Sequence, residues 1–424
     1  MNLICKLMSL GTINKKFVSS VIYRCLTISP CMKSTNTTLL KQLKQKILFK
    51  GPITVSEYMK EVLTNAVSGY YMHNDVFGVQ GDFITSPEIS QMFGELIGIW
   101  CVNEWMQIGS PDKLQVVELG PGRGTLADDM LRVLAQFPGI RDAVSLHLVE
   151  ISPRLRSMQA KKLAGNETKV VEKDDLMTEC CQSCTSRHNN ITVHWYRQLV
   201  DVPKAPSFYV AHEFFDALPI HKFQKVDGQW HEVLIDVNDN ETCLRFVLSP
   251  TNTAASTLLL RVAENDTRNH IEICPEAATL ITHISNRIAN FGGFALIADY
   301  GHTGEKTDTF RAFRQHKLFD VLSEPGTADL TADVDFLYLK QFINNEKVIS
   351  HGPVTQEHFL HNMGITTRLQ VLLNKATNEQ RKNLITGYDM LINPDKMGTR
   401  FKFFALTQHR LINDDMYIPA AFWQ

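Results

Sequence analysis

Residues 114–134, LQVVELGPGRGTLADDMLRVL, decide the fold. A short apolar run is followed by a glycine-rich turn and then by apolar residues at helical spacing, which predicts a strand, a tight turn and a helix. Glycines let the backbone turn sharply and approach a ligand, and the start of a helix offers free N–H groups. The stretch therefore predicts a nucleotide-type crevice at the carboxyl end of a parallel strand.

The glycine spacing indicates which kind of cofactor this crevice takes. Gly120, Gly122 and Gly124 form a GxGxG pattern, and Glu118 stands two positions before the first glycine. Dinucleotide enzymes use GxGxxG, in which a pyrophosphate lies on the helix N-terminus. A carboxylate beside the loop instead suits a cationic cofactor without phosphate, such as a sulfonium. A nicotinamide-dependent oxidoreductase and a purely structural turn are the alternatives.

Further apolar runs predict the rest of the sheet. They are SLHLVEI (145–151), SFYVAHE (207–213), FALIADY (294–300) and, near the end, GTRFKFFALTQ (398–408). Alternation with helical segments predicts an α/β fold with a mostly parallel sheet and right-handed crossovers. Glu150 ends the strand after the glycine loop, where such folds place the acid that binds ribose hydroxyls.

Polar residues follow the fourth strand directly. His212, Glu213 and Asp216 are expected to face the crevice where open α/β sheets bind substrates. Carboxylates match a planar guanidinium in charge and geometry, so Glu213 and Asp216 are candidates for gripping one. Asp216 is alternatively a turn or cap residue, and His212 a structural histidine. Asp299, which ends the fifth strand, either lines the same pocket or terminates the strand.

The remaining segments give a domain outline. Residues 38–112 have mostly helical spacing, with a helix start at Ser86 and Pro87, and residues 113–424 form the α/β domain with insertions at about 221–285 and 301–395. Asp227-Gly228 between alternating segments predicts a hairpin inserted after the fourth strand. Residues 301–346 are loop-like, with several Asp and Gly, and residues 359–373 have helical spacing again.

The first 37 residues resemble a targeting segment. No Asp or Glu occurs in residues 1–50, while Lys and Arg are spread among apolar residues, which is typical of a mitochondrial transit peptide; a disordered basic tail is the alternative. We expect cleavage within residues 29–38 and a mitochondrial matrix location.

Composition excludes several classes of function. The 424 residues carry 43 basic and 45 acidic side chains, so no global charge attracts nucleic acid or an anionic membrane surface. No apolar stretch approaches the roughly 18 residues that a membrane span needs. Cys180, Cys181 and Cys184 lie close to His188, but no second CxxC pair completes a zinc site, and we expect no bound metal.

The motifs together resemble a known family, the MidA-type methyltransferases, which are mitochondrial complex I assembly-factor arginine methyltransferases and their bacterial relatives. The resemblance runs over about residues 51–406 and rests on separate motifs in the same order. These are GDFITSPEIS (81–90), ELGPGRGTL (118–126), HEFFDALP (212–219), ADYGH (298–302), FRQHK (313–317), ADLTADVDF (328–336) and MGTRFKFFAL (397–406).

The resemblance implies a class I, Rossmann-like fold with a mostly parallel seven-stranded sheet, and S-adenosyl-L-methionine as cofactor. It also implies symmetric dimethylation of an arginine on an iron–sulfur-protein subunit of the peripheral arm of complex I. Carried over to this chain, the residues expected at the site are Gly120, Gly122 and Gly124 (methionine part of the cofactor), Glu150 (ribose), Thr85, Pro87 and Glu88 (a closing N-terminal segment) and Glu213 (substrate side). Many relatives have Asn in place of His212, so the resemblance assigns that residue no role. A non-catalytic assembly chaperone on the same fold is the alternative function.

Overall fold

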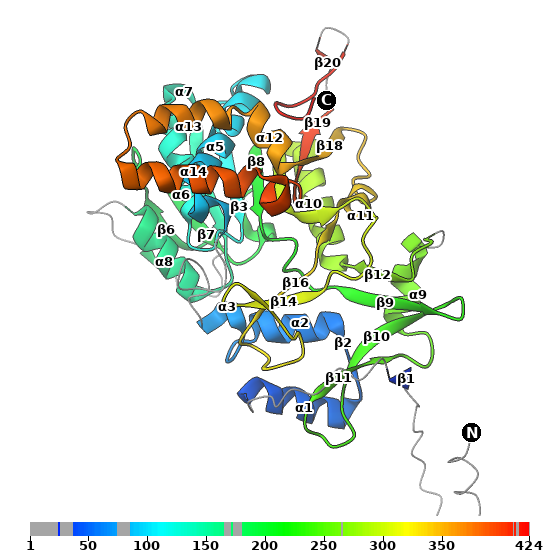
Figure 1. The fold of residues 1–424 in the computed structure, drawn as a ribbon. Coiled ribbons are helices and arrows are strands. Elements are labelled where there is room, and N and C mark those ends of the chain that lie inside the picture. Colours follow the sequence, from blue (N-terminus) through cyan, green and yellow to red (C-terminus); the bar gives the residue numbers. More distant parts are fainter. Residues whose placement is uncertain are drawn as a thin grey trace, which may run out of the picture.

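The computed structural model describes residues 24–25, 37–73, 85–164, 171–172, 180–263, 266–409, 411–412 and 415–423. The expected transit peptide, residues 1–37, lies almost entirely outside these ranges. Figure 1 shows the two parts of the molecule: a large sheet with its helices in the upper half, and a smaller sheet with α1 and α2 below it. Both predicted features, a mostly parallel sheet and an inserted hairpin, are present.

The large sheet has the strand order β18-β19-β13-β8-β3-β4-β7-β6-β5, with β17 beside β13. Neighbours from β13 to β7 run parallel, whereas β19 is antiparallel to both β13 and β18. The seven strands from β18 to β7 form the sheet that the resemblance implies, and β5, β6 and β17 extend it. The bounds are β3 (Leu114–Leu119), β4 (Val144–Val149), β5 (Val171–Glu172), β6 (Cys180–Thr185), β7 (Thr192–Tyr196), β8 (Ser207–His212), β13 (Gly293–His302), β17 (Val334–Asp335), β18 (Val348–Thr355) and β19 (Phe401–Gln408).

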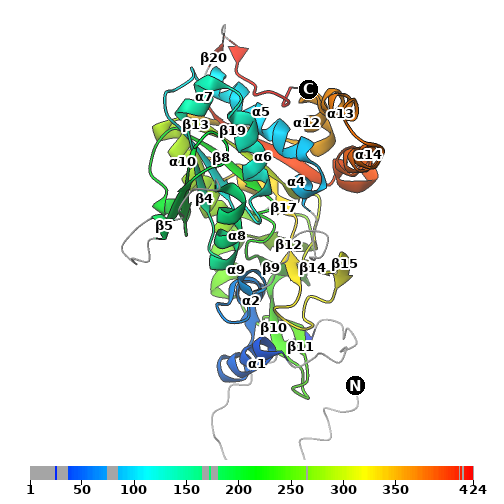
Figure 2. The same ribbon diagram turned by 90° about the vertical axis from the view of Figure 1, so that its left-hand side faces the viewer.

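Both faces of this sheet are covered by helices, which explains its continuous apolar strands. Alternate residues of β3 and β8 point to opposite faces: Val116 and Phe208 pack with one helical layer, and Val117 and Tyr209 with the other. Figure 2 shows α10 on one side of the strands and α5, α6 and α12–α14 on the other. The layers consist of α5 (Gln91–Gln107), α6 (Thr125–Leu134), α7 (Pro138–Ala143), α8 (Pro153–Leu163), α12 (Gln356–Asn362), α13 (Ile365–Leu373) and α14 (Asn378–Ile392), and of α10 (Pro275–Phe291) and α11 (Phe336–Lys340) opposite.

The second, smaller sheet contains more strands than the single hairpin that the sequence predicts. The predicted turn is present, with Asp227 at φ 52° and Gly228 at φ 80° between β9 and β10, but β10 also pairs with β2 and β11. Helices α1 and α2 cover this sheet with a separate apolar core. Its elements are β1 (Arg24–Cys25), α1 (Thr38–Lys50), β2 (Ile53–Thr54), α2 (Val55–Thr64), β9 (His221–Val226), β10 (Gln229–Val237), β11 (Leu244–Leu248) and β12 (His270–Ile273). The N-terminal helices therefore divide: α1 and α2 join the insertion, and α5 joins the main sheet.

Two sequence-based interpretations of secondary structure are wrong in detail, and a third is confirmed. The helix begun at Ser86 ends at Ile89, because Ser90 is extended (φ −157°, ψ 131°), and α5 starts anew after it. Residues 359–373 are helical as predicted, in two helices that meet at Gly364, which has φ 85°. Residues 301–346 are not all loop, since they include a small antiparallel sheet: β14 (Arg311–Arg314), β15 (Lys317–Phe319) and β16 (Asp329–Thr331). The other described elements are α3 (Tyr70–His73), α4 (Ser86–Ile89), α9 (Ala254–Leu259), β20 (Leu411–Ile412), β21 (Asp415–Met416) and the short helical turns Leu199–Asp201, Leu260–Ala263 and Pro394–Gly398.

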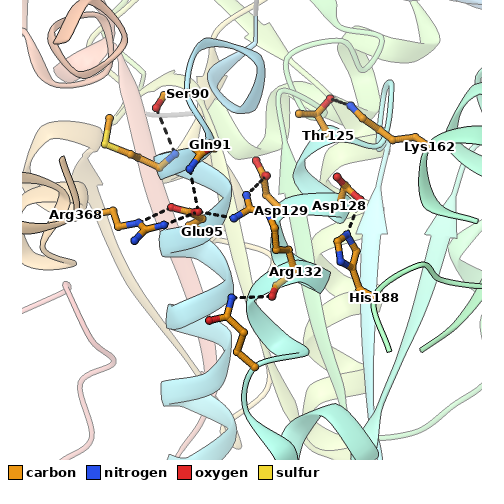
Figure 3. A network of polar contacts seen from close by, with 12 residues as sticks. Ser90, Gln91, Glu95, Thr125, Asp128, Asp129, Arg132, Lys162, His188 and Arg368 are labelled. Atoms are coloured by element: carbon orange, nitrogen blue, oxygen red, sulfur yellow. Dashed lines mark hydrogen bonds and ion pairs between the residues drawn. The ribbon is translucent and has the colours of Figure 1, made fainter. Parts of the chain in front are cut away.

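A buried ion-pair network ties the helices of one layer together, as Figure 3 shows. Glu95 of α5 accepts hydrogen bonds from Arg132 of α6 and from Arg368 of α13, the latter at 2.7 and 2.9 Å. Burial opposes the ionisation of Glu95, but the two arginines outweigh it and lower its pKa. The network fixes α6, the helix that follows the glycine loop, against α5 and α13.

Among the described residues, no helix combines the length and apolar character needed to cross a membrane, and no group of three or more potential metal ligands occurs. Cys184 is buried with a free thiol, and His188 lies 2.9 Å from Asp128. The side chains of Cys180 and Cys181 lie outside the described residues.

Candidate functional site

The glycine loop connects β3 to α6 in a conformation that favours glycine. Gly120, Gly122 and Gly124 have φ of 62°, 52° and 76°. A Cβ on Gly120 would lie 2.5 Å from Cδ2 of Phe214, so a side chain there has no room. Helix α6 begins at Thr125, and its N-cap residue Gly124 has no side chain to cap it, which leaves N–H groups at the helix start for a ligand.

Glu118 lies in β3, directly before this loop. It is 3% exposed, and its Oε2 has no hydrogen-bond partner among the described residues. Burial raises the pKa of Glu118 to about 8, against the attraction of Lys162, which lowers it. A buried carboxyl group without a partner is costly, so this one is suited to a cation that arrives with a ligand.

Glu150 follows β4 and is held from two sides. Its Oε1 accepts the Ser152 N–H at 2.8 Å, and its Oε2 accepts the Gln159 side-chain amide at 3.2 Å. Burial raises the pKa of Glu150 to about 7, although both hydrogen bonds favour the charged form. Gln159 also donates to the Gly122 carbonyl at 2.7 Å, so one buried amide joins the glycine loop to the acid on the neighbouring strand.

A cavity of about 650 Å³ opens at the carboxyl ends of these strands. Gly120, Gly122, Glu150, Glu213 and Asp216 line it, as the sequence predicted for cofactor and substrate residues on one crevice. Its charged lining is mainly acidic: the carboxylates are Glu150, Glu213, Asp216, Glu276 and Asp329, and the basic groups are Lys60 and Arg197. The cavity is therefore suited to cationic ligands.

His212 ends β8, the fourth parallel strand along the chain, and Glu213 follows it directly. Glu213 has φ 48°, an uncommon conformation for a residue with a side chain, and its carboxyl group is buried. Burial and the nearby Asp216 raise the pKa of Glu213 well above its usual value, against a hydrogen bond from the Ser86 backbone. His212 Nε2 lies 3.4 Å from Glu213 Oε1, and burial lowers the pKa of His212 to about 3, so the imidazole is neutral.

Asp216 and Asp299 have different positions. Asp216 lines the cavity and accepts the Thr331 hydroxyl at 2.8 Å; burial raises its pKa to about 6. Asp299 is fully buried, and its Oδ2 accepts the backbone N–H groups of Phe214, Phe215 and Asp216 at 2.9–3.3 Å. Asp299 thus shapes the loop that carries Glu213 and Asp216, and it does not line the cavity.

A second, smaller cavity of about 50 Å³ adjoins the first at the glycine loop. It brings Thr85, Pro87 and Glu88 of the N-terminal segment to Glu118 and His212. Gly120, Gly122 and Glu213 line both cavities, so the two are neighbours across the loop. The residues predicted from the sequence thus converge, with one exception: Gly124 lines neither cavity, and its predicted contact with the cofactor remains a prediction.

Sequence reasoning missed several residues of the site. Gln159 has no motif around it, and its partners are 9 and 37 residues away along the chain. The segment after β7, including Gln198 and Leu199, also lines the main cavity; the run TVHWY (192–196) is the signal that would have located its strand. Tyr71 enters from α3 and donates a hydrogen bond to Asp329 at 2.7 Å.

These features fit S-adenosyl-L-methionine. The cofactor carries a sulfonium and an ammonium cation. Beside the loop, Glu118 and Glu213 each have a carboxyl oxygen without a hydrogen-bond partner among the described residues, and a cation bound there would favour their negative form. The loop leaves no side-chain atoms at Gly120, where a ligand must approach the backbone. Glu150 offers carboxylate oxygens in the position where this fold class binds ribose hydroxyls.

Comparisons with known proteins agree on the family. Residues 96–354 match the family model described as a putative S-adenosyl-L-methionine-dependent methyltransferase. The chain is 51% identical over 376 residues to a zebrafish (Danio rerio) protein named protein arginine methyltransferase NDUFAF7, mitochondrial. The matched region covers 88% of this chain and 87% of the relative. The human protein of the same name is 52% identical over 385 residues, with 90% and 86% covered. The Drosophila melanogaster homologue is 50% identical over 380 residues, with 88% and 86% covered.

A solved structure agrees on the fold. A protein from Burkholderia thailandensis, crystallised with S-adenosyl-homocysteine, superposes with a TM-score of 0.70 at 23% identity, covering 87% of this chain and 91% of that one. The predictions of fold class and cofactor are confirmed. The chain belongs to the family of S-adenosyl-L-methionine-dependent methyltransferases that includes the mitochondrial NDUFAF7 proteins.

Proposed function

We propose that this methyltransferase acts on an arginine of an iron–sulfur-protein subunit in the peripheral arm of complex I, in the mitochondrial matrix, and forms symmetric dimethylarginine. Two sources support the proposal. Relatives at about half identity are named mitochondrial protein arginine methyltransferases. The motif resemblance supplies the complex I subunit and the symmetric product.

One structural observation carries the choice of acceptor. Two buried carboxyl groups, Glu213 and Asp216, line the same cavity as Gly120, Gly122 and Glu150. Carboxylates pair with a guanidinium in plane, and a desolvated pair is stronger than an exposed one. The acidic lining therefore favours a cationic acceptor over a neutral or anionic one.

The chain's residues have distinct proposed roles. When bound, the cofactor supplies a methyl group on an already activated sulfonium, so the protein mainly has to align the acceptor nitrogen. Glu213 and Asp216 hold the guanidinium, and Glu213, with its raised pKa, accepts the proton that the nitrogen loses. The neutral His212, 3.4 Å from Glu213, helps to position that carboxyl group against the acceptor. Glu118, Gly120 and Gly122 hold the amino-acid end of the cofactor.

The N-terminal segment has a proposed closing role. Thr85, Pro87 and Glu88 line the small cavity opposite the glycine loop, and Arg123 of the loop lies 3.9 Å from Glu88. We assign these residues to the wall that shields the methionine part of the cofactor from water. Shielding strengthens electrostatic contacts with the substrate in the same space.

The test is methylation of isolated complex I iron–sulfur subunits, followed by tandem mass spectrometry of the modified arginine. Loss of monomethylamine from the dimethylated residue identifies the symmetric product, whereas loss of dimethylamine identifies the asymmetric one. Glu213→Gln should keep cofactor binding and lose turnover by about a hundredfold or more. The control Glu346→Gln, at an exposed position, should behave as the natural chain. Modification of lysine alone would reject the arginine proposal.

Cell complementation separates catalysis from chaperoning. In cells lacking the protein, the Glu213→Gln variant should reach mitochondria but fail to restore complex I. Full restoration by this variant, with its target arginine unmethylated, would favour the chaperone alternative. Matrix location is checked by protease protection of tagged protein in mitochondria with a ruptured outer membrane.

A further inference from the structure

An apolar groove of about 410 Å³ lies beside the main cavity. Its apolar lining includes Leu258 and Leu259 of α9, Ile273 of β12, Ala278 of α10, and Tyr338 and Phe342 in and after α11. Leu258 is 64% exposed, although it belongs to this apolar lining. A concave surface lined mainly by apolar side chains is suited to an apolar ligand.

The groove and the main cavity share one wall. Pro275, Thr279 and His283 of α10 line both hollows. Thr279 and His283 are exposed and lie on one face of the helix, since they are four residues apart. The two hollows therefore open side by side, on either side of this row of α10 side chains.

The groove and the main cavity differ in charge, so they suit different kinds of side chain. Among the described residues, no Asp, Glu, Lys or Arg lines the groove, whereas five carboxylates line the cavity. A chain with a cationic residue in the cavity and an apolar residue in the groove satisfies both. A nucleic acid or an acidic peptide satisfies neither.

We propose that the groove binds an apolar side chain of the same polypeptide whose arginine enters the main cavity. This inference rests on the proposed function and adds a specificity determinant to it. The row of α10 side chains between the hollows is at most as wide as the whole helix, about 10 Å with side chains, and an extended chain advances about 3.3 Å per residue. The apolar residue is therefore expected about three or four positions from the arginine, and a Leu-, Ile- or Phe-sized side chain fits the volume.

The experiment uses synthetic peptides of about a dozen residues with a central arginine in a Gly/Ser background. One leucine is moved through each of the other positions in turn. Peptide binding is measured by fluorescence anisotropy in the presence of S-adenosyl-homocysteine, and kcat/KM for methylation is measured separately with S-adenosyl-L-methionine. A leucine about three or four residues from the arginine should improve both by roughly tenfold over the leucine-free peptide. Leu258→Asp should remove most of that gain, and Ile385→Asp on α14, also an exposed helical position at 52%, should leave it intact.

The outcomes separate the two claims. If wild-type protein shows no preference for leucine at any position in either measurement, the groove assignment is wrong. It is also wrong if the preference persists in Leu258→Asp with an unchanged melting temperature. If peptides bind with the leucine preference but no arginine is ever methylated, the proposed arginine activity fails while the groove assignment stands.

Discussion

The side-chain amide of Gln159 donates a hydrogen bond to the carbonyl of Gly122 at 2.7 Å. The same nitrogen lies 3.2 Å from Glu150 Oε2, and the Gln159 oxygen accepts the indole N–H of Trp195 at 2.9 Å. One fully buried residue therefore sets the position of the glycine loop relative to the proposed ribose-binding acid.

Gln159→Met keeps the side-chain volume and removes all of these hydrogen bonds. We expect S-adenosyl-L-methionine affinity to fall by about ten- to a hundredfold, because the loop and Glu150 lose their common anchor. The indole N–H left without a partner should lower the free energy of unfolding by about 1–3 kcal/mol. Calorimetric titration measures the affinity, and Gln136→Met, at an exposed position, is the control. Unchanged affinity in Gln159→Met would reject this positioning role.

Gly120→Ala places a Cβ 2.5 Å from the ring of Phe214 at a backbone φ of 62°. We expect loss of cofactor binding, because either the ring or the loop must shift into the ligand space. Gly228→Ala is a matched control, since it has φ 80° but nothing within 4 Å of the new Cβ. That variant should lose about 1 kcal/mol of stability and bind cofactor normally. Normal binding by both variants would contradict the loop assignment.

Asp299→Ala removes the acceptor of three backbone N–H groups in the loop that carries Glu213 and Asp216. We expect turnover to fall by about a hundredfold, with a smaller effect on cofactor affinity, because Glu213 and Asp216 would no longer be held in position to bind the guanidinium. Asp299→Asn retains an oxygen acceptor and should recover much of the turnover. Equal loss in both variants would indicate that the charge of Asp299, rather than its hydrogen bonds, matters. Steady-state kinetics with saturating cofactor make the comparison.

Glu118 should make both stability and cofactor binding depend on pH. Burial raises its pKa to about 8, above the usual value of 4.5, so the folded protein holds this proton more tightly than the unfolded chain. Its contribution to stability is fully present below about pH 4.5 and is lost as pH rises through about 8. Glu118→Gln should therefore raise the melting temperature relative to the natural chain more at pH 8.5 than at pH 5, as scanning calorimetry can measure.

The same group predicts proton release on binding. A cationic amino end paired with Glu118 favours the carboxylate, so the affinity for S-adenosyl-L-methionine should increase between about pH 6 and pH 8. Titrations in buffers of different ionisation enthalpy report the released proton. Glu118→Gln should reduce this release; an unchanged value would assign the proton to another group, such as Glu150, whose pKa is about 7.

Local sequence was sufficient for the features that one short segment determines. The run 114–119 had to be a buried strand, because six buried residues in succession fit a parallel strand covered on both faces. Gly120, Gly122 and Gly124 had to form the turn, because each takes a positive φ that other residues rarely adopt. Asp227-Gly228 predicted its hairpin for the same reason.

Only the tertiary structure decided what depends on residues far apart in the chain. Asp299 contacts a loop 83–85 residues away, and Gln159 bonds Gly122 across 37 residues; neither contact leaves a local pattern. The pairing of β2 with β10, which assigns α1 and α2 to the insertion, is equally non-local. Sequence periodicity indicates which face of a helix or strand is buried. Only the tertiary structure shows against which other element that face packs. The sequence thus determined the chemistry of the crevice, and the folded chain determined its walls, its anchors and the apolar groove beside it.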